Sequence, residues 1–343
     1  MDKKIGFACK FMNPDRNLSL KLLKEIEGQY NSSSTTISWL SRQPTDVAEE
    51  KLWDISIENA KKTYNLVKYV SELPISLRMV RLSSEQCPAY THLKWSYFYK
   101  KTEVKQKLEN LWKKIGDLAK EHNVKLSFHP GQFTCLASDR PDVVENSIAE
   151  FEYHCDMIRW MGFGQKFQDF KCNVHIGGRL GPDGIRAVYP RLSTEAKNTI
   201  TIENDEFGWG LDSCLELSDI IPIVLDIHHH YIRTSGEYIQ PDDNRVVQVL
   251  ESWRGLRPTM HYSVSREEYT KDNNMLPDMS ILLNEGIKAQ KLRAHSDMFN
   301  NTECNKWALS FWDNFDIMCE SKNKNLASMQ LYNFAKTLNT SVY

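Results

Sequence analysis

The stretch VLDIHHHYI, residues 224–232, joins the end of an apolar run to a cluster of ionisable side chains. Asp226 is followed closely by His228, His229 and His230, although the whole chain has only ten histidines. One interpretation is a packed, hydrogen-bonded histidine beside a solvent-exposed pair. The other is a metal site, because Asp-x-x-His at the end of a strand directs a carboxylate and an imidazole to one point. The stretch alone leaves both interpretations open.

Seven further runs of apolar or β-branched residues share the strand character of the run at 221–229. They are residues 5–9, 77–84, 124–130, 172–178, 199–204, 257–264 and 315–321. Apolar residues recur at helical spacing between them, as in 45–73, 104–123, 142–161 and 325–338. Strands that alternate with helices predict a parallel sheet wrapped by helices, and eight repeats predict closure into a (β/α)₈ TIM barrel, an α/β fold.

An open, doubly wound sheet is the competing topology. No Gly-x-Gly-x-x-Gly opens a helix after the first run, which weakens that alternative. The 343 residues suit a single barrel domain over 1–343, with long loops at about 10–42 and 265–308. Thr45 is expected to cap the helix that starts beside it.

The composition indicates a soluble, cytoplasmic protein without membrane contact, and we expect a monomer. No run approaches the roughly 18 apolar residues of a membrane span. The apolar run within the first eleven residues is too short for a signal peptide. The eight cysteines form no Cys-x-x-Cys pair, which argues against a disulfide framework or a zinc ribbon. A formal charge of −2 argues against a broadly basic nucleic-acid surface. Bound divalent cations would invert the local field, so a phosphate-rich partner is still allowed.

Candidate metal ligands gather where the predicted strands end. All strands of such a barrel open on one face, and active sites lie there. The residues are His129, His175, Glu203, Asp226, His229, His261 and Glu320, with His295 in the long loop after the seventh run. Burying so many ionisable groups without a cation costs several kcal/mol each. The pattern therefore predicts a metal cluster, and mixed imidazole and carboxylate ligands suit Zn²⁺, Mn²⁺ or Fe²⁺.

Six strings, in this order, carry a resemblance to a known family: FHPGQF, HIGG, IENDE, LDIHHH, MHYSVS and CESKNK. They are similar to the ultraviolet-damage endonuclease family, a relative of the metal-dependent apurinic-site endonucleases and of the xylose-isomerase-like barrels. The similarity extends from IGFACK near the start to ESKNK near residue 324. FHPGQ followed by IENDE is its most specific part.

The resemblance implies two to three divalent ions, Mn²⁺ or Zn²⁺. His129, His175 and Glu203 would hold the first ion. Glu203 would bridge to a second, which Asp226, His261 and Glu320 hold, and His229 with His295 would hold a third. His228 and His230 would then be core residues or hydrogen-bond partners of the ligands.

The activity implied by the resemblance is ATP-independent cleavage of double-stranded DNA just 5′ of an ultraviolet photolesion, either a cyclobutane dimer or a 6-4 photoproduct. The candidate catalytic residues are Glu203 and Lys322, and Lys322 and Lys324 can contact flanking phosphates. Both lysines can equally be solvated surface residues.

Gln132 and Phe133 occupy the place where members of the family insert a polar and an aromatic side chain at the lesion. Phe133 keeps a stacking face where we expect Tyr. An aromatic lid on the core is the alternative role for Phe133, and Phe7 is a weaker candidate for DNA contact.

Two positions depart from the family pattern. Glu85 stands where some relatives have His, and three roles stay open for it: metal ligand, hydrogen-bond partner of a ligand, or surface acid. Thr259 replaces a lysine that is carboxylated near the metals in some relatives. Metal preference is therefore not fixed by the resemblance.

Three other functions remain as alternatives to the repair endonuclease. They are a sugar isomerase or epimerase on the same barrel, an apurinic-site endonuclease, and a damaged-DNA binding protein without cleavage. Phosphodiester hydrolysis is favoured because a three-ion ligand set exceeds what a compact sugar site needs and because Glu203, Asp226 and Glu320 are all present.

Overall fold

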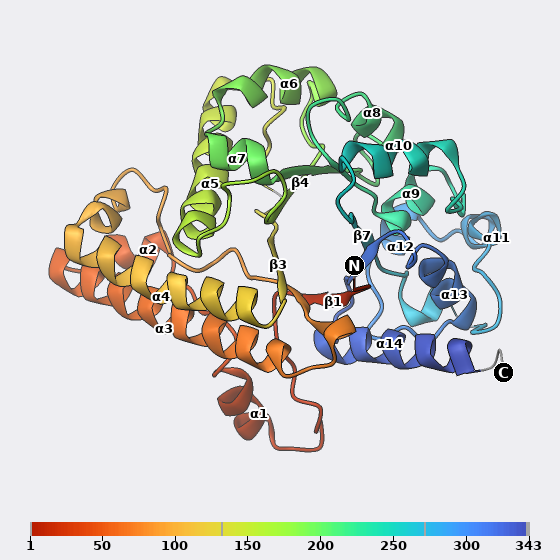
Figure 1. Cartoon of the computed structure of the whole chain (residues 1–343), viewed down its shortest axis with the longest axis horizontal. Coiled ribbons are helices and arrows are strands. Elements are labelled where there is room, and N and C mark those ends of the chain that lie inside the picture. The colour runs from red at the N-terminus through yellow and green to blue at the C-terminus, as the bar shows by residue number, and fades with distance from the viewer. Residues whose placement is uncertain (1, 132, 271, 341–343) are drawn as a thin grey trace.

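The computed structural model describes residues 2–131, 133–270 and 272–340. Eight parallel strands form one sheet in the order β6-β5-β4-β3-β2-β1-β8-β7. The outermost strands meet through a parallel bridge between Asp226 and His261, where His261 N donates to Leu225 O at 2.9 Å. The sheet therefore closes, and helices surround it (Figure 1). The predicted TIM barrel is confirmed, and the open sheet is excluded.

Each of the eight predicted runs coincides with a strand that is shorter than the run, and β4 alone starts one residue before its run. The strands are β1 (Ile5–Ala8), β2 (Met79–Arg81), β3 (Lys125–Phe128), β4 (Lys171–His175), β5 (Ile200–Glu203), β6 (Ile223–Val224), β7 (Thr259–Tyr262) and β8 (Asp316–Cys319).

The longest helices follow the predicted amphipathic segments, and α3 and α4 lie side by side (Figure 1). The α-helices outside the two predicted loops are α3 (Thr45–Ser71), α4 (Thr102–Glu121), α5 (Pro141–Trp160), α6 (Gly181–Val188), α7 (Thr194–Thr199), α8 (Leu211–Leu215), α9 (Ile227–Arg233), α10 (Asn244–Ser252) and α14 (Lys324–Thr340). Short 3₁₀ turns are η1 (Ile75–Leu77), η2 (Ser96–Lys100), η3 (Tyr189–Arg191) and η4 (Glu267–Tyr269). The prediction that Thr45 caps α3 is wrong, because Pro44 is the N-cap and no side chain caps the helix.

The two segments predicted as long loops contain helices. Helices α1 (Leu20–Glu27) and α2 (Ile37–Ser41) lie within 10–42. Helices α11 (Met279–Asn284) and α12 (Ala289–Leu292) lie within 265–308, and α13 (Thr302–Ser310) starts there. No helix of the described residues is long and apolar enough to cross a bilayer.

The three adjacent histidines lie in a helix and not at the end of a strand, which corrects the sequence-based interpretation. Strand β6 ends at Val224, and Asp226 is the N-cap of α9. The Asp226 carboxylate accepts a hydrogen bond from His229 N at 2.7 Å. An aspartate at this position satisfies an amide that the first helical turn leaves free, so the chain turns into α9 directly after the strand.

Strand side chains alternate between two environments. On one face lies the large apolar core between sheet and helices, with Phe7, Phe128 and Trp112 among its buried members. The other face points into the barrel, where Ala8, Met79 and Met318 form a separate small apolar cluster. Most of the remaining barrel interior is polar or charged, which is unusual, because barrel interiors are normally filled by branched aliphatic residues.

Candidate metal centre

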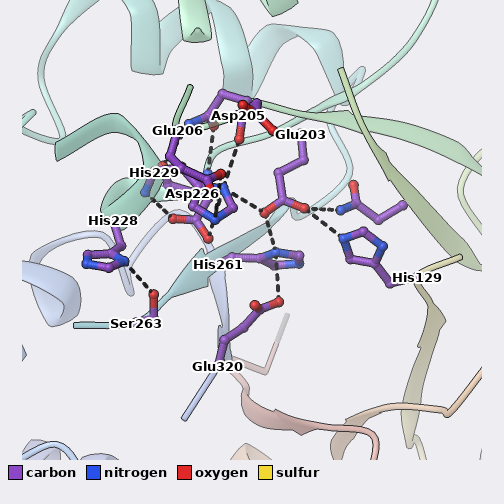
Figure 2. A network of polar contacts seen from close by, with 12 residues as sticks. His129, Glu203, Asp205, Glu206, Asp226, His228, His229, His261, Ser263 and Glu320 are labelled. Carbon is purple, nitrogen blue, oxygen red and sulfur yellow. Dashed lines mark hydrogen bonds and ion pairs between the residues drawn. The ribbon is translucent and has the colours of Figure 1, made fainter. Parts of the chain in front are cut away.

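Three groups of acids and imidazoles meet at the carboxyl ends of the strands. In each group one ligand atom per residue lies within 4.8 Å of the others. The groups are His129, His175 and Glu203; Glu203, Asp226 and His229; and Asp226, His261 and Glu320. Because Glu203 and Asp226 each belong to two groups, the three form one continuous cluster (Figure 2).

Glu203, at the end of β5, lies at the centre of this cluster with 1% of its surface exposed. Its Oε2 lies 3.1 Å from His129 Nε2, and its Oε1 lies 2.9 Å from His261 Nδ1 and 3.6 Å from His229 Nδ1. Burial alone raises the pKa of Glu203. The nearby imidazoles of His261 and His175 outweigh it and hold the pKa well below the ordinary value, so the group is a carboxylate.

Asp226 and His229 share a second part of the cluster. Burial, with repulsion from Glu203 and Glu320, raises the pKa of Asp226 well above its ordinary value despite the nearby His229. Burial opposes protonation of His229, but Asp226, Glu203 and neighbouring acids raise its pKa to about 10. The acids around His229 therefore favour a positive charge at this position.

Glu320, after β8, is held by a buried arginine that the sequence analysis missed. Arg81, at the end of β2, donates to Glu320 Oε1, and the same oxygen lies 3.2 Å from His261 Nδ1. Burial raises the pKa of Glu320, but Arg81 and His261 outweigh it and hold the pKa well below the ordinary value. Arg81 therefore fixes this carboxylate in its charged form toward the cluster.

Lys171 and Asn173, on β4, were also missed, and both contact ligands. Lys171 Nζ lies 2.9 Å from His261 Nε2, and Asn173 Nδ2 donates to Glu203 Oε2. Burial lowers the pKa of Lys171 to about 7. Residues 171, 173 and 175 share one strand face, so the period-2 pattern from His175 backwards was the signal that could have found them. Thr259, at the lysine position of some relatives, is buried and its hydroxyl has no hydrogen-bond partner among the described residues.

Two buried ligand atoms lack hydrogen-bond partners within the described part of the chain. They are His175 Nδ1 and Asp226 Oδ2. Leaving a buried acceptor unsatisfied costs about 1–3 kcal/mol. A divalent cation accepts electron pairs from this donor set, so the chemistry of the cluster fits metal binding.

A cavity of 800 Å³, which we call the mouth cavity, opens the cluster to solvent. His175, His229 and Glu320 line its floor, and Phe133 and His295 line its wall. His295 belongs to none of the three groups, and its ring centre lies 5.9 Å from that of His228. Phe133 is 87% exposed, which disagrees with the alternative of an aromatic lid on the core.

The remaining histidine candidates are hydrogen-bonded away from the ligand groups. His228 is buried between the hydroxyls of Ser263 and Ser265, at 3.0 and 3.2 Å. His230 Nε2 lies 2.9 Å from Glu237 Oε2.

The other candidates differ in how close they lie to the cluster. Glu85 is exposed and lies in none of the three groups. Lys322 is exposed and pairs with Asp297 at 3.1 Å, whereas Lys324 is half-buried at the start of α14. Phe7 is 1% exposed and packs in the core, where DNA cannot reach its ring, so it is withdrawn as a DNA contact. Gln132 lies outside the described residues.

The closed barrel, with its acid and imidazole cluster at the carboxyl ends of the strands, places the molecule among the (β/α)₈ barrel enzymes, whose active sites lie at that end. Comparison with known proteins narrows the class. The family model "UV-endonuclease UvdE" matches residues 4–341, and the chain belongs to this family. It is therefore a nuclease of a family that acts on ultraviolet-damaged DNA.

Named relatives agree with this assignment. The chain is 30% identical over 312 residues to the UV DNA damage endonuclease of Bacillus mycoides (strain KBAB4), which covers 87% of this chain and 86% of the relative. It is 29% identical over 311 residues to the corresponding protein of Bacillus cereus (strain B4264), with the same coverage.

Two solved structures share the fold. The crystal structure of SacUVDE superposes with a TM-score of 0.73 at 23% identity, covering 98% of this chain and 99% of the other. Endonuclease IV from Thermus thermophilus superposes with a TM-score of 0.50 at 12% identity, covering 80% of this chain and 94% of the other.

Proposed function

We propose that this protein hydrolyses one phosphodiester bond of double-stranded DNA immediately 5′ of an ultraviolet photolesion, without ATP, and leaves a 3′-hydroxyl and a 5′-phosphate. Cyclobutane dimers and 6-4 photoproducts are the proposed lesions. Two to three divalent ions, Mn²⁺ or Zn²⁺, are the proposed cofactor.

The position of Glu203 carries this proposal. One carboxylate oxygen faces His129 and the other faces His261 and His229, so a single side chain reaches all three ligand groups. A carboxylate in that position suits a bridge between neighbouring ions. When bound, such ions lower the pKa of a coordinated water and stabilise charge on the attacked phosphate.

The protein side chains prepare the site for that chemistry. Arg81 donates to the carboxylate of Glu320, and Asn173 donates to that of Glu203, so both carboxylates are held in place within the cluster. Lys171 holds the ring of His261. Groups fixed in this way lose little freedom when the substrate binds.

The rim of the mouth cavity suits contact with a nucleic acid. Phe133 presents an exposed ring beside the cluster, and an exposed aromatic side chain can stack on a base at a disrupted step. Arg293 lines the mouth cavity, and Lys322 follows Glu320 by two residues; both are exposed and can pair with flanking phosphates.

The test is nicking of an ultraviolet-irradiated supercoiled plasmid by purified protein with Mn²⁺ or Zn²⁺. We expect relaxation of irradiated plasmid, no relaxation of unirradiated plasmid, and loss of activity after chelation. Sequencing of the product ends should place the nick directly 5′ of the lesion, with a 3′-hydroxyl.

Other results point to other activities. Cleavage of a depurinated plasmid alone indicates an apurinic-site endonuclease, and turnover of an aldose without nicking indicates a sugar isomerase. Binding of irradiated DNA without cleavage at any tested metal indicates a damage-binding protein. Each of these outcomes contradicts the proposal.

A further inference from the structure

A second cavity lies at the opposite end of the barrel, at the amino ends of the strands. It has a volume of 420 Å³, and we call it the foot cavity. Its charged lining consists of five cationic side chains, Lys4, Lys120, Lys125, Lys171 and Arg257, and three acids. The foot cavity contains none of the ligand groups described above, so it is a separate site.

Two of the three acids in the foot cavity already accept several hydrogen bonds from the protein itself. Asp316, which is 2% exposed, accepts hydrogen bonds from Lys4 N at 2.8 Å, Lys125 Nζ at 2.9 Å and Arg257 Nε at 2.8 Å. The carboxylate of Asp169 accepts three backbone amides, at 2.7, 3.2 and 3.2 Å. The third acid, Asp2, is exposed.

Two lysines of the foot cavity, the buried Lys4 and the exposed Lys120, donate to carbonyl oxygens. Lys4 Nζ donates to Asn123 O at 2.6 Å, and Lys120 Nζ donates to Gly162 O at 2.6 Å. Lys4 is 5% exposed, and burial lowers its pKa although Asp316 is near. A neutral carbonyl oxygen compensates a buried positive charge only in part, so the foot cavity keeps an excess of positive charge.

The shape of the foot cavity also suits a small ligand. Its volume lies within the roughly 300–1,000 Å³ of small-molecule sites. Part of its wall is apolar and consists of Phe163, Phe170 and Trp253. Gln168 also lines it, and its buried Oε1 has no hydrogen-bond partner among the described residues. The cavity thus combines charged and polar groups with apolar wall, and polar groups placed in this way can orient a compact ligand.

We propose that the foot cavity binds a small oxyanion, either free phosphate or the phosphate group of a small ester. An oxyanion accepts several N–H donors at once, and charge-assisted bonds of this kind are about twice as strong as neutral ones. The hydroxyl groups of an ester would also give Gln168 Oε1 a donor. The foot cavity lies at the end of the barrel away from the mouth and contains none of the proposed metal ligands, although one of its lining residues, Lys171, contacts His261.

The experiment measures thermal unfolding of the metal-free, chelator-free protein while inorganic phosphate or ribose 5-phosphate is titrated at constant ionic strength. The acids of the metal-free mouth oppose these anions, and the variants of the foot cavity described below distinguish binding there from binding elsewhere. We expect a rise in Tm that saturates as for one site, because a ligand that binds only the folded protein stabilises it. Saturation by phosphate at the lower concentration identifies free phosphate as the ligand, and saturation by ribose 5-phosphate at the lower concentration identifies an ester.

Two lysines on the same helix provide a matched comparison. Lys120→Met removes a cation of the foot cavity, whereas Lys114→Met removes an exposed cation of α4 that does not line it. The half-saturating concentration should rise about tenfold or more for Lys120→Met and stay unchanged for Lys114→Met. Lys4→Met tests the deeper end of the cavity in the same way.

Two results overturn the proposal. The first is the absence of saturable stabilisation by either probe beyond that of equal ionic strength in chloride. The second is equal binding by Lys120→Met, Lys114→Met and the unsubstituted protein. Neither result changes the outcome expected for nicking of irradiated plasmid.

Discussion

The mouth and the foot of the barrel are both rich in buried charge, but their charges have opposite sign and are satisfied differently. At the mouth, Glu203, Asp226 and Glu320 face mainly imidazoles, and Asp226 Oδ2 has no hydrogen-bond partner among the described residues. At the foot, Asp316 is a single buried carboxylate with three donors. A fully bonded carboxylate stabilises the fold, whereas a partly bonded cluster keeps ligand capacity for something outside the chain. The comparison therefore supports the proposal of metal binding at the mouth and indicates a structural role for Asp316.

The largest effect is expected from Glu203→Gln at the mouth. The variant keeps the shape of the side chain but loses the charge that two of the three ligand groups share and that faces His261 of the third. Nicking of irradiated plasmid should therefore fall more than about 100-fold, which exceeds the usual cost of losing a ligand's outer partner. Metal content, measured by mass spectrometry, should fall by at least one ion, while the circular dichroism spectrum stays unchanged.

Glu206→Gln is the matched control for Glu203→Gln. Glu206 Oε2 lies 3.7 Å from His229 Nε2 but belongs to none of the three groups. The control should keep most of its activity and its metal content. Near-normal nicking by Glu203→Gln would show that the ligand assignment is wrong.

A substitution at the foot should lower the stability of the fold and leave metal binding unchanged. Asp316→Asn leaves Lys125 and Arg257 without their shared buried counter-charge, and breaking such a pair costs about 3 kcal/mol. Urea unfolding should show that loss, and metal content should stay at the level of the unsubstituted protein. A loss of metal without a loss of stability would remove the distinction between the two ends.

The sequence predicted the fold better than it predicted the site. All eight strands were predicted, because each is an apolar run long enough to be recognised between amphipathic helices. The path after β6 was not predicted. An apolar run ending in Asp226 also fits a longer strand, and only the hydrogen bond from His229 N shows that a helix begins there.

Part of the site was predictable because its ligand types are distinctive. The three groups of neighbouring ligands contain seven of the eight proposed metal ligands, and His295 lies outside them. Arg81 and Lys171 were not predicted, because a basic residue within a strand usually indicates a solvent-exposed face. Only the closed barrel shows that both point inward at ligands.

His154, on α5, tests whether an unsatisfied buried atom alone indicates a ligand site. It is 0% exposed, its Nδ1 lies 2.7 Å from Glu150 O, and its Nε2 has no partner among the described residues. It belongs to none of the ligand groups, and burial lowers its pKa from 6.5 to about 4. We expect this histidine to affect stability only.

The sign of its pH effect follows from the lowered pKa. Between pH 6.5 and about 4 the unfolded chain binds a proton at His154 that the folded protein does not, so stability falls as the pH falls through this window. The shift corresponds to about 3 kcal/mol. Between these two pH values, the unfolding free energy of His154→Phe should fall by about 3 kcal/mol less than that of the unsubstituted protein. Metal content should not change. An identical pH profile would mean that His154 is protonated in the folded protein.

The smallest effect is expected from Lys171→Met, which joins the two regions, because Lys171 lines the foot cavity and contacts His261 at the mouth. Methionine keeps most of the volume but leaves His261 Nε2 without its partner. Loss of such an outer partner lowers metal affinity about tenfold, as a chromophoric chelator in competition should show. Activity should return at higher metal concentration, because the ligands themselves are intact.

Lys125→Met is the control from the foot. The Lys125 side chain pairs with Asp316, so this variant should lower stability and leave metal affinity unchanged. If both variants bind metal as tightly as the unsubstituted protein, His261 is held in place by the strands alone. The charges at the foot and at the mouth then act independently.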